Sequence, residues 1–190
     1  YSSAAYLHLS IRRQRQMCIR DRYEESLKMP FIVSWPGVTK PGSRDHHLIQ
    51  NIDYAETFLE IAGAKIPGDM QGRSLVPLLK GQSPKNWRTS IYYHYYEYPS
   101  FHMVPRHYGI RTERYKLMHF YRFGNEWEMY DLQKDPDELT NLYGQLGQAK
   151  LTADLKKQLY ALQKHYGDES DLSEMPKEWK DKVRPGTAQK

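Results

Sequence analysis

Cysteine and long apolar runs are both scarce in this chain of 190 residues. The single cysteine, Cys18, excludes an intrachain disulfide framework and a zinc site built from several cysteines. No segment approaches the roughly 18 consecutive apolar residues that a membrane-spanning helix needs, so we expect no membrane partner. These absences leave a globular chain of one or two domains.

An excess of basic over acidic residues is also missing from most of the chain, although the formal net charge is +5. Residues 1–22 hold five of the 28 basic residues against one acid, which leaves 23 basic and 22 acidic residues after them. A nucleic-acid surface needs a basic stripe on folded elements. We therefore expect no nucleic acid partner.

Aromatic residues are abundant, with 16 tyrosines among them, and this content excludes a disordered chain. Many tyrosines fall in Ile91–Tyr98, which is aromatic on both faces when read as a strand. Such a pattern favours a strand covered on both sides. The alternative is a platform on which sugar rings stack.

The first 22 residues differ in character from the rest. They lack an initiator methionine and the long apolar stretch of a secretory signal. The segment SIRRQRQMCIRDR resembles the peptide that sequencing-adapter DNA encodes when it is translated. We therefore expect residues 1–22 to be a non-native leader and the natural sequence to continue from about Tyr23.

Residues 23–86 contain an apolar run and a helix. Phe31–Trp35 is β-rich and lies between two prolines, which predicts a buried strand that belongs to a larger sheet. Asp53–Ala62 is predicted to be a helix, with Asp53 as its N-cap, Glu56 completing a capping box, and an apolar face at Tyr54, Phe58, Ile61 and Ala62.

Strands dominate from Trp87 onward. After Ile91–Tyr98, strands are predicted at His107–Thr112, Tyr115–Tyr121 and Glu126–Leu132, with a hairpin turn at Gly124-Asn125. Asp135 is predicted to start a helix. Leu151–Tyr166 has a leucine at nearly every turn of one face, so it is predicted to be a helix packed on the sheet. Residues 167–190 form a polar tail.

Five stretches of this sequence, taken in order, resemble the C-terminal part of a type I sulfatase of the alkaline phosphatase superfamily. They are YEESLKMPFIVSWPG, NIDYAETFLEIAGAKIP, MQGRSLVPLLKG, RHYGIRTERYKLMHFY and EWEMYDLQKDPDELTNLYG, and together they cover most of Tyr23–Gly144. The last two resemble the sulfatases that act on sulfated glycans.

The predicted strands and helices amount to an α+β chain, and the resemblance implies what its parts are. Residues 23–86 would be the end of a truncated α/β catalytic domain, and residues 87–166 would be the C-terminal subdomain, an antiparallel sheet of three to four strands with a packed helix. The implied function is that of a fragment of a sulfuric ester hydrolase that acts on sulfated carbohydrate in the periplasm or outside the cell. Its partners would be the sulfated carbohydrate and the missing N-terminal catalytic portion.

The resemblance also implies a formylglycine, made from Cys or Ser in a C-x-P-x-R type motif, and a calcium ion for the full-length enzyme. Cys18 does not fit that motif because Arg20 stands where the proline is required. Ile19 stands where the family usually has a sulfate-contacting lysine. We therefore expect no catalytic residue and no metal ligand in this chain, and an inactive fragment.

Residues that could contact a substrate gather in Tyr98–Arg111, a long connection between two predicted strands. Imidazoles suit sugar hydroxyls, and the arginine fork suits a sulfate through paired hydrogen bonds. His102, Arg106 and His107 are therefore the predicted substrate-binding residues. The alternative is that His107 and Arg111 have structural roles, pairing across the sheet or with Glu113.

Two other functions stay open at this point. A phosphodiesterase or phosphonate hydrolase of the same superfamily would carry similar stretches, and the nucleophile motif that separates these enzymes from sulfatases is absent. A non-catalytic glycan-binding module could be built on the aromatic strand. The Asp45-His46-His47 run does not predict a metal site, because no third ligand stands at a suitable spacing.

Overall fold

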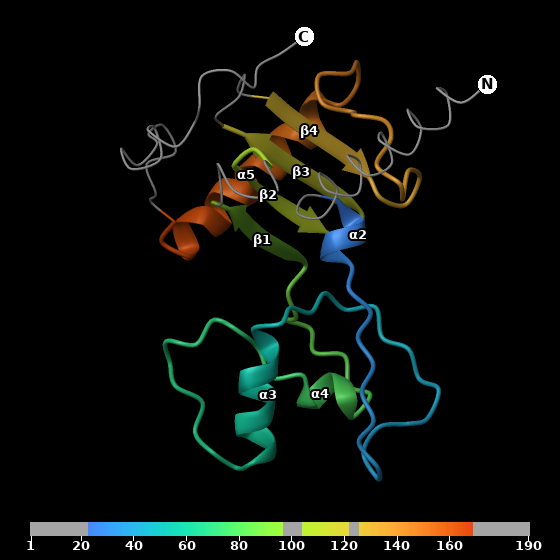
Figure 1. The fold of residues 1–190 in the computed structure, drawn as a ribbon, viewed down its shortest axis with the longest axis vertical. Helices are drawn as coiled ribbons and strands as arrows, with labels where there is room; N and C mark the ends of the chain where they lie inside the picture. The colour runs from blue at the N-terminus through green and yellow to red at the C-terminus, as the bar shows by residue number, and fades with distance from the viewer. Residues whose placement is uncertain (1–22, 97–103, 122–125, 169–190) are drawn as a thin grey trace, which may run out of the picture. The chain divides into compact units, whose positions relative to one another are not determined.

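The computed structural model describes residues 23–96, 104–121 and 126–168 (Figure 1). They form two compact units. The sheet unit combines residues up to Met29 with those from Tyr92 onward, and the helical unit is Pro30–Ile91. The helical unit is thus an insertion between two segments of the sheet unit.

The sheet unit is built on four strands in the order β1-β2-β3-β4. Their bounds are β1 Ser90–Tyr95, β2 His107–Thr112, β3 Tyr115–Phe120 and β4 Glu126–Asp131. β3 pairs antiparallel with both β2 and β4. The predicted α+β fold and all four predicted strands are therefore confirmed, while the predicted turn at residues 124–125 lies outside the described residues.

Side chains alternate between the two faces of this sheet. Leu117 of β3 stands between Ile110 and Met129, and all three side chains point to one face. The neighbouring Lys116 is paired with Arg111 and Tyr130 on the opposite face. One face is thus apolar at its centre, and the other brings two cations side by side.

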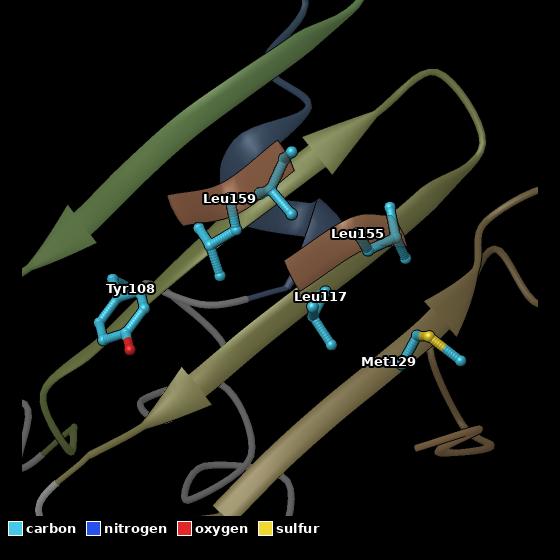
Figure 2. Packing of buried hydrophobic residues seen from close by; sticks show 6 residues of the cluster. Tyr108, Leu117, Met129, Leu155 and Leu159 are labelled. Atoms are coloured by element: carbon cyan, nitrogen blue, oxygen red, sulfur yellow. The ribbon is translucent and has the colours of Figure 1, made fainter. Parts of the chain in front are cut away.

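The helix α5, Ala149–His165, covers the apolar face. Figure 2 shows its Leu155 and Leu159 facing Leu117 and Met129 of the sheet. Leu159 is 0% exposed. The predicted helix at Leu151–Tyr166 and its leucine face are therefore confirmed, because burying that face is what stabilises such a helix.

The short helix α2, Glu24–Leu27, belongs to the sheet unit although about 60 residues separate it from β1 in the sequence. Glu24 is buried, and the ring of Tyr23 lies edge-on to Tyr130 of β4 at 6.2 Å between ring centroids. The contacts with Tyr130 and Lys116 place α2 against the face opposite α5.

The helical unit contains α3, Asp53–Ile61, and α4, Val76–Leu79. The prediction of a helix from Asp53 is confirmed, but the predicted capping box is wrong. Asp53 is the first helical residue, and no side chain caps the helix at Ile52. Glu56 is buried against Gly72, where a Cβ atom would overlap its carboxylate.

Two further predictions are wrong, each for a physical reason. Phe31–Trp35 forms no strand, because no strand of the described residues pairs with it and an unpaired strand cannot satisfy its backbone hydrogen bonds. No helix starts at Asp135. The chain turns there instead, and Glu138 adopts a φ of 52° that is incompatible with a helix.

The apolar face of α3 is exposed, whereas its polar residues Asp53, Glu56 and Thr57 are buried. Large apolar side chains of the helical unit share this exposure. Phe58 is 70% exposed and Ile32 92%. The ring of Phe31 stacks on Tyr54 at 5.1 Å and extends the same apolar surface. Among the described residues, no helix has both the length and the apolar character needed to span a membrane.

The core under α5 can be tested with Leu159→Ala. The substitution deletes a fully buried side chain, so we expect the free energy of unfolding to fall by about 2–5 kcal/mol. Urea denaturation followed by circular dichroism measures this loss. Leu146→Ala is the control, because Leu146 is fully exposed and its change should stay within about 0.5 kcal/mol. Equal effects of the two substitutions would contradict the assigned core.

The exposed apolar face of α3 predicts that this chain associates with itself when it is produced alone. Phe58→Ser should raise the monomer fraction in sedimentation velocity, because it removes the most exposed aromatic ring of that face. Leu146→Ser, which removes an even more exposed side chain from a turn of the sheet unit, should leave the distribution unchanged. A parent chain that is monomeric throughout would overturn this expectation.

Candidate functional site

The face of the sheet opposite α5 carries a group of three buried charges and one half-buried arginine that we term the charge clasp: Glu24, Arg111, Lys116 and Glu138. Arg111 donates two hydrogen bonds to the Glu24 carboxylate, at 3.3 Å from Nε and 3.0 Å from Nη2. Arg111 and Lys116 are direct neighbours across β2 and β3. Like charges in that position repel, and the two carboxylates compensate for the repulsion.

Lys116 is the most unusual member of the clasp, because its side chain is 0% exposed. Its Nζ lies 2.8 Å from Oε1 of Glu138 and 4.0 Å from Oε1 of Glu24. Burial lowers the pKa of Lys116, and Glu138 opposes that shift. Burial likewise raises the pKa of Glu138 against the pull of Lys116. Each group therefore offsets part of the cost of burying the other's charge.

Tyr93 of β1 reaches toward the clasp from the edge of the sheet. It crosses Gly109 of β2, where a Cβ atom would overlap the tyrosine ring, so only glycine fits. The Tyr93 hydroxyl is buried and has no hydrogen-bond partner among the described residues. Burial, reinforced by the nearby Glu138, Glu24 and Glu128, raises its pKa well above the usual value. Tyr93 is therefore a neutral hydroxyl group.

Of the three predicted substrate-binding residues, the structure describes Arg106 and His107. His102 falls outside the described residues. Arg106 and His107 are both buried, and His107 is 0% exposed. The His107 ring stacks on Tyr95 at 5.4 Å, and its Nδ1 lies 2.9 Å from the Pro105 carbonyl oxygen.

His107 lies on the same face of β2 as Gly109 and the clasp residue Arg111, because the three residues are spaced two apart along the strand. Arg111 pairs with Glu24 and not with Glu113, which the sequence offered as its partner. The sequence analysis did not identify Glu24, Lys116 or Glu138 as a group. Their only signal was that each lies in one of the family-like stretches, at YEES, YKL and DPDEL.

A second polar cluster lies at the α5 end of the sheet unit. His94 of β1 uses both ring nitrogens, with Nδ1 2.6 Å from Oδ2 of Asp168 and Nε2 3.0 Å from the Tyr121 hydroxyl. Tyr92 also donates a hydrogen bond to Asp168. Because Asp168 follows α5, this cluster fastens the end of the helix to β1 and to the end of β3.

Asp53 organises the helical unit. Its carboxylate accepts hydrogen bonds from the Arg73 amide at 2.8 Å, from the Gln50 amide at 2.7 Å and from both terminal nitrogens of Arg88. Thr57, one turn later, accepts a hydrogen bond from the Leu75 amide at 2.8 Å. The buried side chains of Asp53 and Thr57 are thus satisfied by backbone amides and by one arginine, which is a structural role, whereas Oε2 of Glu56 has no hydrogen-bond partner among the described residues.

The described residues contain no group of three or more His, Cys, Asp or Glu side chains placed to hold a metal ion. The Asp45-His46-His47 run is a local arrangement, in which His47 contacts Oδ1 of Asp45 at 2.7 Å and Oγ of Ser83 at 3.1 Å. The described part of the chain therefore does not fit the calcium site that the resemblance implies for a full-length enzyme.

The family model described as N-sulphoglucosamine sulphohydrolase, C-terminal, matches residues 16–165. The chain belongs to this sulfohydrolase family. The match includes β1–β4, α5 and every member of the charge clasp. The predicted resemblance to sulfatases of the alkaline phosphatase superfamily is confirmed.

Relatives of this sulfohydrolase C-terminal region are longer proteins. The chain is 48% identical over 151 residues to an N-acetylglucosamine-6-O-sulfatase of Bacteroides thetaiotaomicron, which covers 78% of this chain and 27% of the relative. The solved structure of BT4656 in complex with its substrate D-glucosamine-2-N,6-O-disulfate matches with a TM-score of 0.70 at 46% identity, over 73% of this chain and 28% of that one. The chain thus spans about a quarter of the length of these relatives.

A phosphonate monoester hydrolase from Silicibacter pomeroyi shares the fold as well. It matches with a TM-score of 0.58 at 26% identity, over 69% of this chain and 28% of that chain. The fold therefore extends beyond sulfatases, but the identity to the glucosamine sulfatase is much higher.

His94 gives the sheet unit a pH-dependent stability. Burial lowers the pKa of His94 below 6.5, and the Asp168 carboxylate opposes this shift. The folded state then binds the proton less readily than the unfolded state. The contribution is complete above the unfolded pKa and is lost as the pH falls through the folded pKa. The free energy of unfolding should therefore decrease in mild acid.

We expect His94→Gln to make this acid-dependent decrease shallower in urea denaturation at a series of pH values. His165→Gln is the control, because His165 is exposed at the end of α5. Its variant should keep the slope of the parent chain. Identical slopes for the parent and His94→Gln would show that His94 does not couple folding to protonation.

Proposed function

We propose that this chain is the C-terminal part of a sulfuric ester hydrolase that acts on sulfated carbohydrate. The observation that carries the proposal is the family match over residues 16–165, together with 48% identity to a sulfatase of known substrate class. Because the chain spans about a quarter of that relative, we propose that the reaction needs the longer protein and that this chain alone is inactive.

The substrate class follows from the similarity to glucosamine sulfatases. The relative from Bacteroides thetaiotaomicron is named for the 6-O-sulfate of N-acetylglucosamine, and the BT4656 structure contains a glucosamine that is sulfated at N2 and O6. A sulfated glucosamine is therefore the first substrate to test. The more distant similarity to a phosphonate monoester hydrolase makes phosphonate esters the second.

We propose that the nucleophile and metal ion belong to the missing N-terminal portion. Cys18 lacks the proline that a formylglycine motif requires, and the described residues offer no metal site. A formylglycine and a calcium ion would supply the nucleophile and the charge that screens the sulfate.

The exposed apolar face of the helical unit also supports a further N-terminal portion that packs on this chain. Phe31, Ile32 and Phe58 would lose their contact with water if the missing N-terminal portion packed against them. Burying a face of this kind is the usual reason why an amphipathic helix is stable.

We also propose that the enzyme works in the periplasm or outside the cell, where sulfated glycans are met.

His102, Arg106 and His107 remain our proposed substrate-binding residues. In support, Arg106 and His107 lie shortly after residues 97–103, and His107 is the first residue of β2, on the face that carries the clasp. Because the His107 ring is fully buried, its part in substrate binding would be exerted through Pro105, whose carbonyl oxygen it contacts.

The longer protein should release inorganic sulfate from 6-O-sulfated N-acetylglucosamine, whereas this chain alone should not. Ion chromatography of the released sulfate measures the activity of each protein. Phenyl methylphosphonate is the substrate for the comparison with phosphonate hydrolysis. Faster hydrolysis of the phosphonate ester would favour the second candidate. Saturable binding of sulfated oligosaccharides to this chain, with no hydrolysis by the longer protein, would favour a glycan-binding module.

In the longer protein, His107→Ala should lower kcat/KM for a sulfated glycan about ten- to a hundredfold, which corresponds to about 1–3 kcal/mol. Hydrolysis of a small aryl sulfate should change little, because remote contacts act only on a substrate that reaches them. Met118→Ala is the control, since Met118 is equally buried in the neighbouring strand β3. Equal losses for both substrates would place His107 at the sulfate itself.

A further inference from the structure

The charge clasp joins parts of the chain that are far apart in the sequence. Glu24 begins α2, Arg111 and Lys116 stand on adjacent strands of the sheet, and Glu138 follows β4. The separation between Glu24 and Glu138 is 114 residues. The clasp is therefore the contact through which α2 is attached to the sheet, together with the packing of Tyr23 on Tyr130.

The clasp holds the main chain of α2 as well as its side chains. The backbone N–H of Glu24 donates a hydrogen bond of 2.6 Å to Oε2 of Glu138. Glu138 reaches this position with a φ of 52°, which a non-glycine residue rarely adopts. An anchor on a backbone atom fixes the path of the chain more tightly than an anchor on a flexible side chain.

The clasp is a costly way to gain stability. Removing charges from water costs several kcal/mol for each ion, and buried ion pairs can often be replaced by apolar residues without loss of stability. Lys116 Nζ and Glu138 Oε1 form an ion pair at 2.8 Å, and neither atom has another hydrogen-bond partner among the described residues. Strain and incomplete hydrogen bonding together point to a role in specifying geometry.

The position of α2 gives this geometry a purpose. The chain passes through α2 and then leaves the sheet unit for the helical unit after Met29. The family region is a C-terminal one, and its relatives are about four times as long as the part that this chain matches. The clasp thus holds the point at which the rest of such a protein would join the sheet.

We propose that Lys116 and Glu138 are positioning residues, which hold the backbone of Glu24 and thereby set the path of the chain that enters the sheet unit from the catalytic part. The inference rests on the proposed function only for its consequence in catalysis. Docking of α2 itself can be measured on this chain.

Two double variants separate positioning from stability. Lys116→Met with Glu138→Ala removes both charges, and with them the oxygen that accepts the Glu24 N–H. Lys116→Met with Glu138→Gln also removes both charges but keeps an acceptor oxygen at that place. Asp131→Asn is the matched control, because it breaks the ion pair with Arg114 in the same sheet, and the Asp131 carboxylate accepts hydrogen bonds from Arg114 and the Gln133 amide, which both lie outside α2.

Hydrogen–deuterium exchange of the 190-residue chain, read at Tyr23–Leu27, is the first measurement. We expect the alanine double variant to accelerate exchange in this segment at least tenfold while β2–β4 keep their protection. The glutamine double variant should restore slow exchange, and Asp131→Asn should leave the segment unchanged. If β2–β4 lose protection as much as Tyr23–Leu27 does, or if glutamine fails to rescue, the clasp serves general stability and the proposal is wrong.

The second measurement is sulfate release by the longer protein. The alanine double variant should lower kcat at least tenfold, and the glutamine double variant should recover most of it at an unchanged melting temperature. Unchanged turnover in a variant whose α2 exchanges rapidly would overturn the positioning role. If the parent protein hydrolyses no sulfate ester at all, the proposed function fails, and the exchange data alone decide whether the clasp positions α2.

Discussion

The alternation of side chains along β3 is the constraint on which the sheet unit depends. Leu117 points to α5 and completes the apolar core, while its neighbour Lys116 points to the opposite face and meets Glu138. A shift of β3 by one residue would exchange these two environments, placing an ammonium group under α5 and a leucine among carboxylates. The packing of α5 and the attachment of α2 therefore enforce the same register.

The two faces use different physical interactions. Between α5 and the sheet, Leu155 and Leu159 stabilise the packing by burying apolar surface. This interaction is strong, but it has no preferred direction and tolerates small shifts. On the other face, Arg111, Lys116 and Glu138 depend on charge and hydrogen-bond geometry, which specifies one arrangement at a cost in desolvation. A fold that belongs to sulfatases and is shared with a phosphonate monoester hydrolase thus combines a stabilising face with a specifying one.

The helical unit buries the polar face of α3 and exposes the apolar one, which is the reverse of an isolated domain. Asp53 buries its carboxylate among Arg88 and backbone amides, while Phe58 on the other side of α3 stays exposed. An amphipathic helix that turns its polar face inward is accounted for when a further layer of protein covers the apolar face. The chain's coverage of about a quarter of its relatives agrees with such a layer.

The sequence alone determined whatever depends on short-range periodicity. Three features were predictable, because each shows in a short stretch of sequence: the leucine face of α5, the alternation of side chains in β2–β4 and the helix at Asp53. Only the tertiary structure decided the absence of a strand at Phe31–Trp35, the turn at Glu138 and the charge clasp. Each of these features depends on residues that are distant in the sequence. The contact between Glu24 and Glu138, for example, spans 114 residues, and no local pattern can reveal it.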